Sequence, residues 1–231
     1  YKQQHVDGAK TLMITSSVSG EGKTFCSINI ATIFALSEKK TVILGLDLRK
    51  PKLFAEFNLS NEVGIVNYLI KQKSLDEIIF PTGVPYLDVI VSGPVPPNPA
   101  EMVMSDGMKE LIEELKKKYD YIILDTPPVG LVSDAIELSQ YCDVILYIVR
   151  QNFSKKEMIG QLNNRVKRGE LSNVSIILNS FENKAKYGAG YGYGYGYGYG
   201  YGAYSNGYHE EEAPRNIFEK IIREIRKKRT Q

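Results

Sequence analysis

Short apolar runs that recur between residues 11 and 178 constrain the fold of this chain more than any other feature of its sequence. Each run is apolar nearly throughout, which is typical of β-strands covered on both faces. Helical patterns separate the runs, and this alternation predicts an α/β fold with a doubly wound, mostly parallel sheet and helices on both faces. The predicted strands are Thr11–Ser16, Thr41–Leu46, Leu87–Ser92, Tyr121–Asp125, Val144–Val149 and Val174–Leu178. The predicted helices are Phe25–Ser37, Val63–Lys71, Ser74–Phe80, Asp106–Lys118, Ser133–Gln140 and Lys155–Arg168.

The composition changes sharply after the last predicted strand. We expect a globular domain over residues 1–186, within which the proline-rich segment Ser92–Pro99 is a loop that leaves a strand end. Residues 187–208 hold nine of the chain's sixteen tyrosines, most of them alternating with glycine, and are predicted to be a flexible tail. Residues 209–231 predict a basic helix with one apolar face, which could pack on its own domain, on a partner or on a membrane surface.

Charge and cysteine content narrow the class of protein. The net charge of +2 is small, so bulk charge favours no particular partner, and we expect no nucleic-acid binding. Cys26 and Cys142 fit no metal-binding spacing and are expected to be reduced thiols, which favours the cytosol. No apolar run approaches the ~20 residues of a membrane span, and no signal peptide is visible. The chain begins at Tyr1 without an initiator methionine, so the sequence leaves open whether a membrane segment precedes it.

Residues 16–24, S-S-V-S-G-E-G-K-T, form a phosphate-binding loop between a predicted strand and a predicted helix. They match the pattern GxxxxGK[ST] except that Ser17 replaces the first glycine. Two glycines let backbone N–H groups turn toward a phosphate at the helix N-terminus, while Lys23 can reach the β- and γ-phosphates and Thr24 suits Mg²⁺. These features predict a P-loop NTPase-like nucleotide site made of Ser19, Gly20, Glu21, Gly22, Lys23, Thr24 and Phe25.

Two acidic residues follow strands at the same predicted edge of the sheet. Asp125 ends the apolar run Y-I-I-L-D, where a Walker B aspartate would hold the magnesium shell, and a buried acid there needs a partner. Asp47 lies in V-I-L-G-L-D-L-R-K-P after the second strand. A helix cap or a salt bridge with Arg49 is the structural alternative for Asp47.

Together these motifs resemble Walker A, Walker A′ and Walker B of the bacterial tyrosine kinases, the BY-kinases of capsule and exopolysaccharide systems. The segment S-G-P-V-P-P-N-P-A-E-M is similar to the G-x-x-P-P-N-P-x-E segment of that family. The tyrosine-rich carboxyl tail also resembles the tails of that family. The resemblance spans about residues 10–208.

The resemblance implies a protein-tyrosine autokinase that uses ATP and Mg²⁺ and often transfers phosphate between protomers of a ring. Lys23, Asp47 and Asp125 would be catalytic, and Thr24, Asp47 and Asp125 would serve the metal. Asn179 would contact the base, although a strand-end asparagine that caps a turn is an equal alternative. The phosphoacceptors would be Tyr187, Tyr191, Tyr193, Tyr195, Tyr197, Tyr199, Tyr201, Tyr204 and Tyr208.

The family also implies a cellular setting. The expected partners are other copies of the chain, a membrane polysaccharide co-polymerase segment that is upstream or separate, and a cognate tyrosine phosphatase. The expected location is the cytoplasmic side of the cell membrane, and the expected role is regulation of polysaccharide polymerisation and export. Unmodified tails would dock into neighbours, and phosphorylated tails would release the assembly.

Two departures from the family pattern keep alternatives open. Gly45 stands where the family's D-x-D-x-R has its first acid, and residues 1–10 lack the E-x-x-R-x-x-R motif that builds rings. A ParA/MinD-like ATPase would normally have lysine at the position of Val18. A scaffold without kinase activity, in which nucleotide sets the shape and the tyrosine tract is adhesive, is the other alternative.

Overall fold

The structure is a computed structural model that describes residues 8–182. The predicted tail and basic helix, and the boundary predicted at residue 186, lie outside the described residues. Within 8–182, no helix is both long and apolar enough to cross a bilayer. Cys26 is buried and Cys142 half-buried, and both are free thiols, as the sequence predicts.

A seven-stranded sheet with the order β3-β4-β2-β5-β1-β6-β7 forms the centre of the domain. All neighbouring strands are parallel except β3 and β4, so the predicted mostly parallel sheet is confirmed. The strands are β1 Lys10–Ser16, β2 Thr41–Gly45, β3 Phe80–Pro81, β4 Leu87–Ile90, β5 Tyr121–Asp125, β6 Val144–Arg150 and β7 Val174–Asn179.

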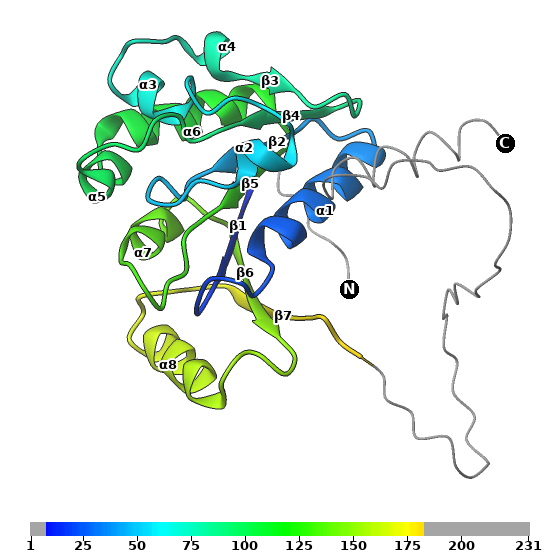
Figure 1. Cartoon of the computed structure of the whole chain (residues 1–231), viewed down its shortest axis with the longest axis vertical. Helices are drawn as coiled ribbons and strands as arrows, with labels where there is room; N and C mark the ends of the chain where they lie inside the picture. The colour runs from blue at the N-terminus through cyan, green and yellow to red at the C-terminus, as the bar shows by residue number, and fades with distance from the viewer. Residues whose placement is uncertain (1–7, 183–231) are drawn as a thin grey trace, which may run out of the picture.

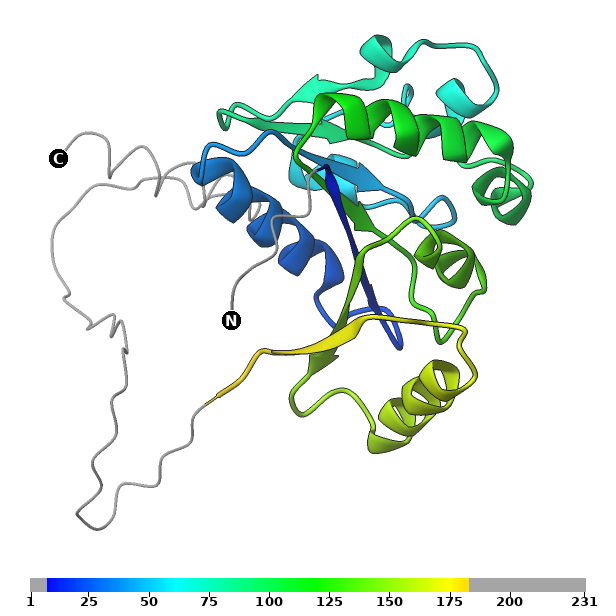
Figure 2. The ribbon, with the colours of Figure 1, turned by 180° about the vertical axis from the view of Figure 1, so that it is seen from behind.

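Helices cover both faces of the sheet (Figures 1 and 2). α1 packs on one face, whereas α6 and α8 pack on the other. The helices are α1 Lys23–Leu36, α2 Leu53–Glu56, α3 Ile65–Leu69, α4 Leu75–Ile78, α5 Pro99–Val103, α6 Asp106–Lys118, α7 Asp134–Ser139 and α8 Lys156–Lys167.

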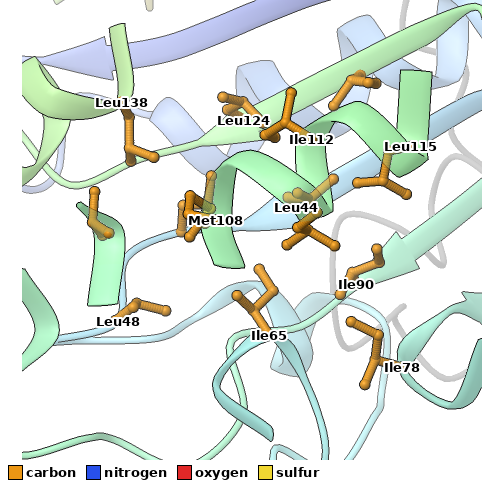
Figure 3. Close-up of a cluster of buried hydrophobic side chains, with 14 of the residues drawn as sticks. Leu44, Leu48, Ile65, Ile78, Ile90, Met108, Ile112, Leu115, Leu124 and Leu138 are labelled. Carbon is orange, nitrogen blue, oxygen red and sulfur yellow. The ribbon is translucent and has the colours of Figure 1, made fainter. Parts of the chain in front are cut away.

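Successive residues of the central strands enter different cores. In β5, Ile123 packs on the α1 side, whereas Ile122 and Leu124 pack on the opposite side. Figure 3 shows the core on the α6 side of the sheet, in which Leu44 and Leu124 of the sheet face Met108 and other residues of α6. Because both faces are buried, these strands are apolar throughout, and each fully buried side chain of this kind contributes about 1.5–3 kcal/mol.

The sequence prediction is wrong at several element ends. The helix expected to end at Phe80 ends at Ile78, and Phe80–Pro81 instead pair antiparallel with β4 at the sheet edge, where proline is tolerated. All six predicted strands are present, and each of their ends is right to within two residues. The short helices α2 and α5 were not predicted, and Pro99 is the first residue of α5 and not the last of the loop.

Candidate nucleotide site

A cleft of about 250 Å³ opens beside the carboxyl ends of β1, β2 and β5. The order β2-β5-β1 places the phosphate-binding loop, the Asp47 loop and Asp125 side by side, and Gly45 pairs with Asp125 in the register. The predicted residues therefore meet at one edge of the sheet. The cleft is lined by Ser19, Gly20, Gly22, Lys23, Thr24, Phe25, Asp47, Lys50, Lys52, Glu56, Asp125 and Thr126.

The phosphate-binding loop has the backbone geometry that its glycines allow. Gly20 has φ 89° and Gly22 has φ 95°, a left-handed conformation that side chains disfavour. Gly22 is the N-cap residue of α1, so the positive end of that helix begins at the cleft. The Nζ atom of Lys23 donates a hydrogen bond to Ser16 Oγ at 3.2 Å. Burial lowers the pKa of Lys23, and the nearby carboxylates of Asp125, Asp47 and Glu21 oppose this shift.

The replacement of the first motif glycine by Ser17 is accommodated in the structure. Ser17 is 4 % exposed, and its hydroxyl lies 2.5 Å from the hydroxyl of the buried Tyr147. Its φ is not in the left-handed region, so no glycine is required there. Gly130 instead allows the close approach, because a β-carbon on Gly130 would lie 2.3 Å from the carbonyl oxygen of Ser17.

Asp125 is joined to the first turn of α1 by two hydroxyl groups. Thr24 Oγ1 donates to Asp125 Oδ2 at 2.8 Å, and Ser27 Oγ donates to Oδ1 at 3.1 Å. Burial raises the pKa of Asp125 to about 6, while these hydrogen bonds and the charge of Lys23 act in the opposite direction. Ser27 was not predicted, although its place three residues after Thr24 puts both side chains on one helix face.

The same residues fit a magnesium ion that arrives with phosphates. A threonine hydroxyl and a carboxylate are hard oxygen donors, and Mg²⁺ normally keeps several waters and uses only one or two carboxylates. Consistent with this, residues 8–182 contain no cluster of three or more acidic, histidine or cysteine residues that could hold a metal ion by themselves.

Asp47 lines the cleft, as predicted for a site residue, and forms no ion pair with Arg49. Asp47 Oδ1 accepts a hydrogen bond from the backbone N–H of Lys50 at 3.0 Å, which closes a turn ahead of α2. Arg49 turns instead to Asp134, a residue that is 3 % exposed, and donates from Nε at 2.7 Å and from Nη2 at 3.0 Å. The salt-bridge alternative for Asp47 is therefore wrong. The helix-cap alternative is wrong as well, because Lys52 is the N-cap residue of α2 and Asp47 closes the turn before it.

Glu21 and Asn179 stabilise the phosphate-binding loop through hydrogen bonds within the protein. The side chain of Glu21 is fully buried, and its carboxylate accepts hydrogen bonds from Val18 N and Ser154 Oγ. Its carboxylate is thus engaged within the protein, and only its backbone can serve the predicted nucleotide contact. Asn179 Nδ2 donates to the carbonyl oxygen of Glu21 at 2.9 Å, and its Oδ1 accepts from Ser180 N at 2.8 Å. A contact between Asn179 and a base stays a prediction.

Four residues that line the cleft were not predicted from the sequence: Lys50, Lys52, Glu56 and Thr126, which directly follows Asp125. Lys50, Lys52 and Glu56 follow Asp47 and come to the cleft with the turn and with α2. The R-K-P-K run after the second strand was a possible signal for the two lysines, because ammonium groups bind phosphates. Nothing local distinguishes Glu56 from an ordinary surface acid.

Comparisons with known proteins show which family the chain belongs to. A family model described as an AAA domain matches residues 9–176. The tyrosine-protein kinase CpsD of Streptococcus agalactiae serotype III (strain NEM316) is 35 % identical over 181 residues, which cover 78 % of this chain and 78 % of that protein. The chain belongs to the bacterial tyrosine kinase family.

Further similarities agree with membership of the bacterial tyrosine kinases. The tyrosine-protein kinase YwqD of Bacillus subtilis (strain 168) is 40 % identical over 148 residues, which cover 64 % of this chain and 62 % of that protein. The solved kinase domain of the Escherichia coli tyrosine kinase ETK superimposes with a TM-score of 0.73 at 34 % identity, covering 81 % of this chain and 73 % of that one. The chain therefore spans less than two thirds of the length of YwqD.

Proposed function

We propose that this chain is an ATP-dependent protein-tyrosine autokinase that phosphorylates its own carboxyl-terminal tyrosines. The observation that carries the proposal is the hydrogen bond of 2.8 Å between Thr24 and Asp125 in a cleft that also contains Lys23. This hydrogen bond joins the phosphate-binding loop to the acid at the end of the neighbouring strand β5. Two further observations support the proposal: the chain belongs to the bacterial tyrosine kinase family, and residues 187–208 contain nine tyrosines.

The cleft has a group for each part of phosphoryl transfer. The backbone N–H groups of the loop and Lys23 bind the β- and γ-phosphates of ATP and stabilise the charge that spreads over the transferred group. Thr24 and Asp125, with Asp47 opposite, would hold Mg²⁺, which supplies further neutralisation of phosphate charge when bound. Lys50 and Lys52 add positive charge at the same cleft.

The proposed acceptors are the tail tyrosines, presented to the cleft of a neighbouring copy. Residues 187–208 could span up to roughly 70 Å at about 3.3 Å per residue, so reach does not limit transfer between protomers. Each phosphate adds about −1.5 to −2 charges, so nine would give the tail on the order of −14 to −18. Repulsion of that charge by a phosphate-filled cleft would release a docked tail, which is the basis of the proposed switch.

The wider setting is proposed from the family. The chain would act at the cytoplasmic side of the membrane with a polysaccharide co-polymerase segment and a tyrosine phosphatase, and would regulate polysaccharide polymerisation and export. Size-exclusion chromatography of unmodified and fully phosphorylated protein tests the switch; equal masses would contradict it.

A phosphopeptide map of residues 187–208 after incubation with ATP and Mg²⁺ tests the activity. Wild-type protein and a Lys109→Met control, altered at an exposed residue outside the cleft, should gain tail phosphate, and Lys23→Met should not. Mixing Lys23→Met protein with a tail-deleted active copy tests transfer between protomers, since phosphate on the Lys23→Met tail requires it. A wild-type tail without phosphate would overturn the proposal.

The second candidate is a scaffold whose nucleotide sets its shape without transfer. Its support is Gly45, which leaves the cleft without the first acid of the family motif. Tight binding of ATP together with an unmodified wild-type tail would favour it. The ParA/MinD-like alternative has no comparable support, because Val18 stands where those ATPases have lysine.

A further inference from the structure

Side chains pack closely around Gly45, the position of the missing acid. A β-carbon on Gly45 would lie 3.2 Å from Ser92 Oγ and 3.4 Å from two carbons of Leu53. Leu53 is 2 % exposed, and Ser92 donates a hydrogen bond to the Gly45 carbonyl oxygen at 2.7 Å. A β-carbon at Gly45 would therefore touch Leu53 at ordinary contact distance and would require the Ser92 hydroxyl to shift by a few tenths of an ångström.

The same helix brings a different carboxylate to the cleft. α2 spans Leu53–Glu56, so the residue that fills the space beside Gly45 begins the helix and Glu56 ends it. Glu56 lines the cleft together with Lys23, Asp47 and Asp125. The helix thus packs beside the position of the missing acid and brings another acid to the cleft.

One carboxylate oxygen of Glu56 lacks a hydrogen-bond donor. Its Oε2 atom is buried and has no hydrogen-bond partner among residues 8–182. Both oxygens of Asp125 accept hydrogen bonds, from Thr24 and Ser27, and Asp47 Oδ1 accepts one from Lys50 N. A buried acceptor without a donor costs free energy, so a donor brought by a substrate would be bound favourably.

We propose that Glu56 is a catalytic residue that accepts the proton of the tyrosine hydroxyl, in place of the acid absent at Gly45. The inference rests on the proposed kinase function. The phenol oxygen forms a bond to the γ-phosphorus, the bond from that phosphorus to the β,γ-bridging oxygen breaks, ADP leaves with the electron pair, and the phenol proton passes to Glu56 Oε2. A phenol O–H is a donor of the kind that the unpartnered oxygen lacks.

Steady-state phosphorylation of a synthetic Tyr-Gly repeat peptide by Glu56→Gln protein tests this role. Glutamine keeps the shape of the side chain and loses its basicity, so we expect kcat to fall about 100- to 10,000-fold. Binding of a fluorescent ATP analogue with Mg²⁺ should stay within twofold of wild type, which also shows that the variant is folded. Glu62→Gln, altered at an exposed acid outside the cleft, should match wild type in both measurements.

The outcomes separate the inference from the kinase proposal. A fall in kcat of less than fivefold overturns the role of Glu56 and leaves the kinase proposal intact. Weakened binding of the Mg²⁺–nucleotide complex by more than twofold also overturns it, since it would place Glu56 on the metal or phosphate side of the reaction. If wild-type protein phosphorylates neither the peptide nor its own tail, the kinase proposal itself fails.

Discussion

The side-chain nitrogen of Asn179, at the end of β7, occupies the space in which a side chain on Gly22 would begin. A β-carbon on Gly22 would lie 2.1 Å from Asn179 Nδ2, and Gly22 also has φ 95°. A residue from the last strand thus packs against the predicted phosphate-binding loop.

Gly22→Ala should therefore destabilise the protein through two effects. The left-handed backbone costs about 1–2 kcal/mol for a residue with a side chain, and displacement of Asn179 adds about 1 kcal/mol for its lost hydrogen bond to Glu21. Gly83→Ala is the matched control, because Gly83 has φ 81° but nothing within 4 Å of a β-carbon. Urea denaturation measures the free energy of unfolding of both variants. Equal losses of stability would contradict the close approach of Asn179 to Gly22.

Asn179→Ala tests whether Asn179 acts on the loop or on a base. If it positions the loop, its loss should weaken binding of ATP and of inorganic triphosphate to a similar extent, about fivefold for one hydrogen bond. Calorimetric titration with each ligand gives the answer. Weaker binding of ATP with unchanged binding of triphosphate would instead support the predicted base contact.

Asp125→Asn should stabilise the metal-free protein at neutral pH. Burial raises the pKa of Asp125 from 3.8 to about 6, so the folded state holds this proton more tightly than the unfolded chain. The associated stability is present below pH 4 and is lost as the pH rises through about 6. We expect the variant to gain about 1–3 kcal/mol at pH 7.5 and little at pH 4.5, by chemical denaturation in a chelator. A gain that does not change with pH would contradict this account.

Asp134→Asn should lower the melting temperature by roughly 5–10 °C. The change removes the buried partner of Arg49 and with it a two-point ion pair between the Asp47 loop and α7. Glu113→Gln breaks the exposed pair with Lys116 and should change the melting temperature by no more than about 2 °C. Similar shifts for both variants in a thermal scan would argue against a structural role for the Arg49 pair.

Ser17→Gly, which restores the common loop pattern, should destabilise the protein by about 1 kcal/mol. The loss comes from the hydrogen bond to Tyr147, and Tyr147→Phe should cost a similar amount because it leaves the buried Ser17 hydroxyl unpaired. The double variant should cost less than the sum, since both changes remove one contact. Additive losses in urea denaturation would show that the two hydroxyls do not interact.

Much of the fold and the centre of the site could be predicted because their signals are local. A strand buried on both faces is apolar along its whole length, as β5 is, and Tyr121–Asp125 was predicted with its observed bounds. The spacing from Gly20 to Thr24 likewise specifies a loop that leads into a helix. β3 could not be predicted in this way, since a strand of two residues exists only through its pairing with β4.

The order of the residues along the chain determined that Lys23 and Thr24 would begin a helix after the first strand and that Asp125 would end a strand. Apolar runs and loop spacing are properties of short segments. Only the tertiary structure decided which distant groups meet there. Asn179 packs against Gly22, Asp134 pairs with Arg49, and Glu56 lines the cleft. These contacts depend on the order of the strands in the sheet and on packing between the sheet and its helices. Neither leaves a repeating pattern within a short stretch of sequence.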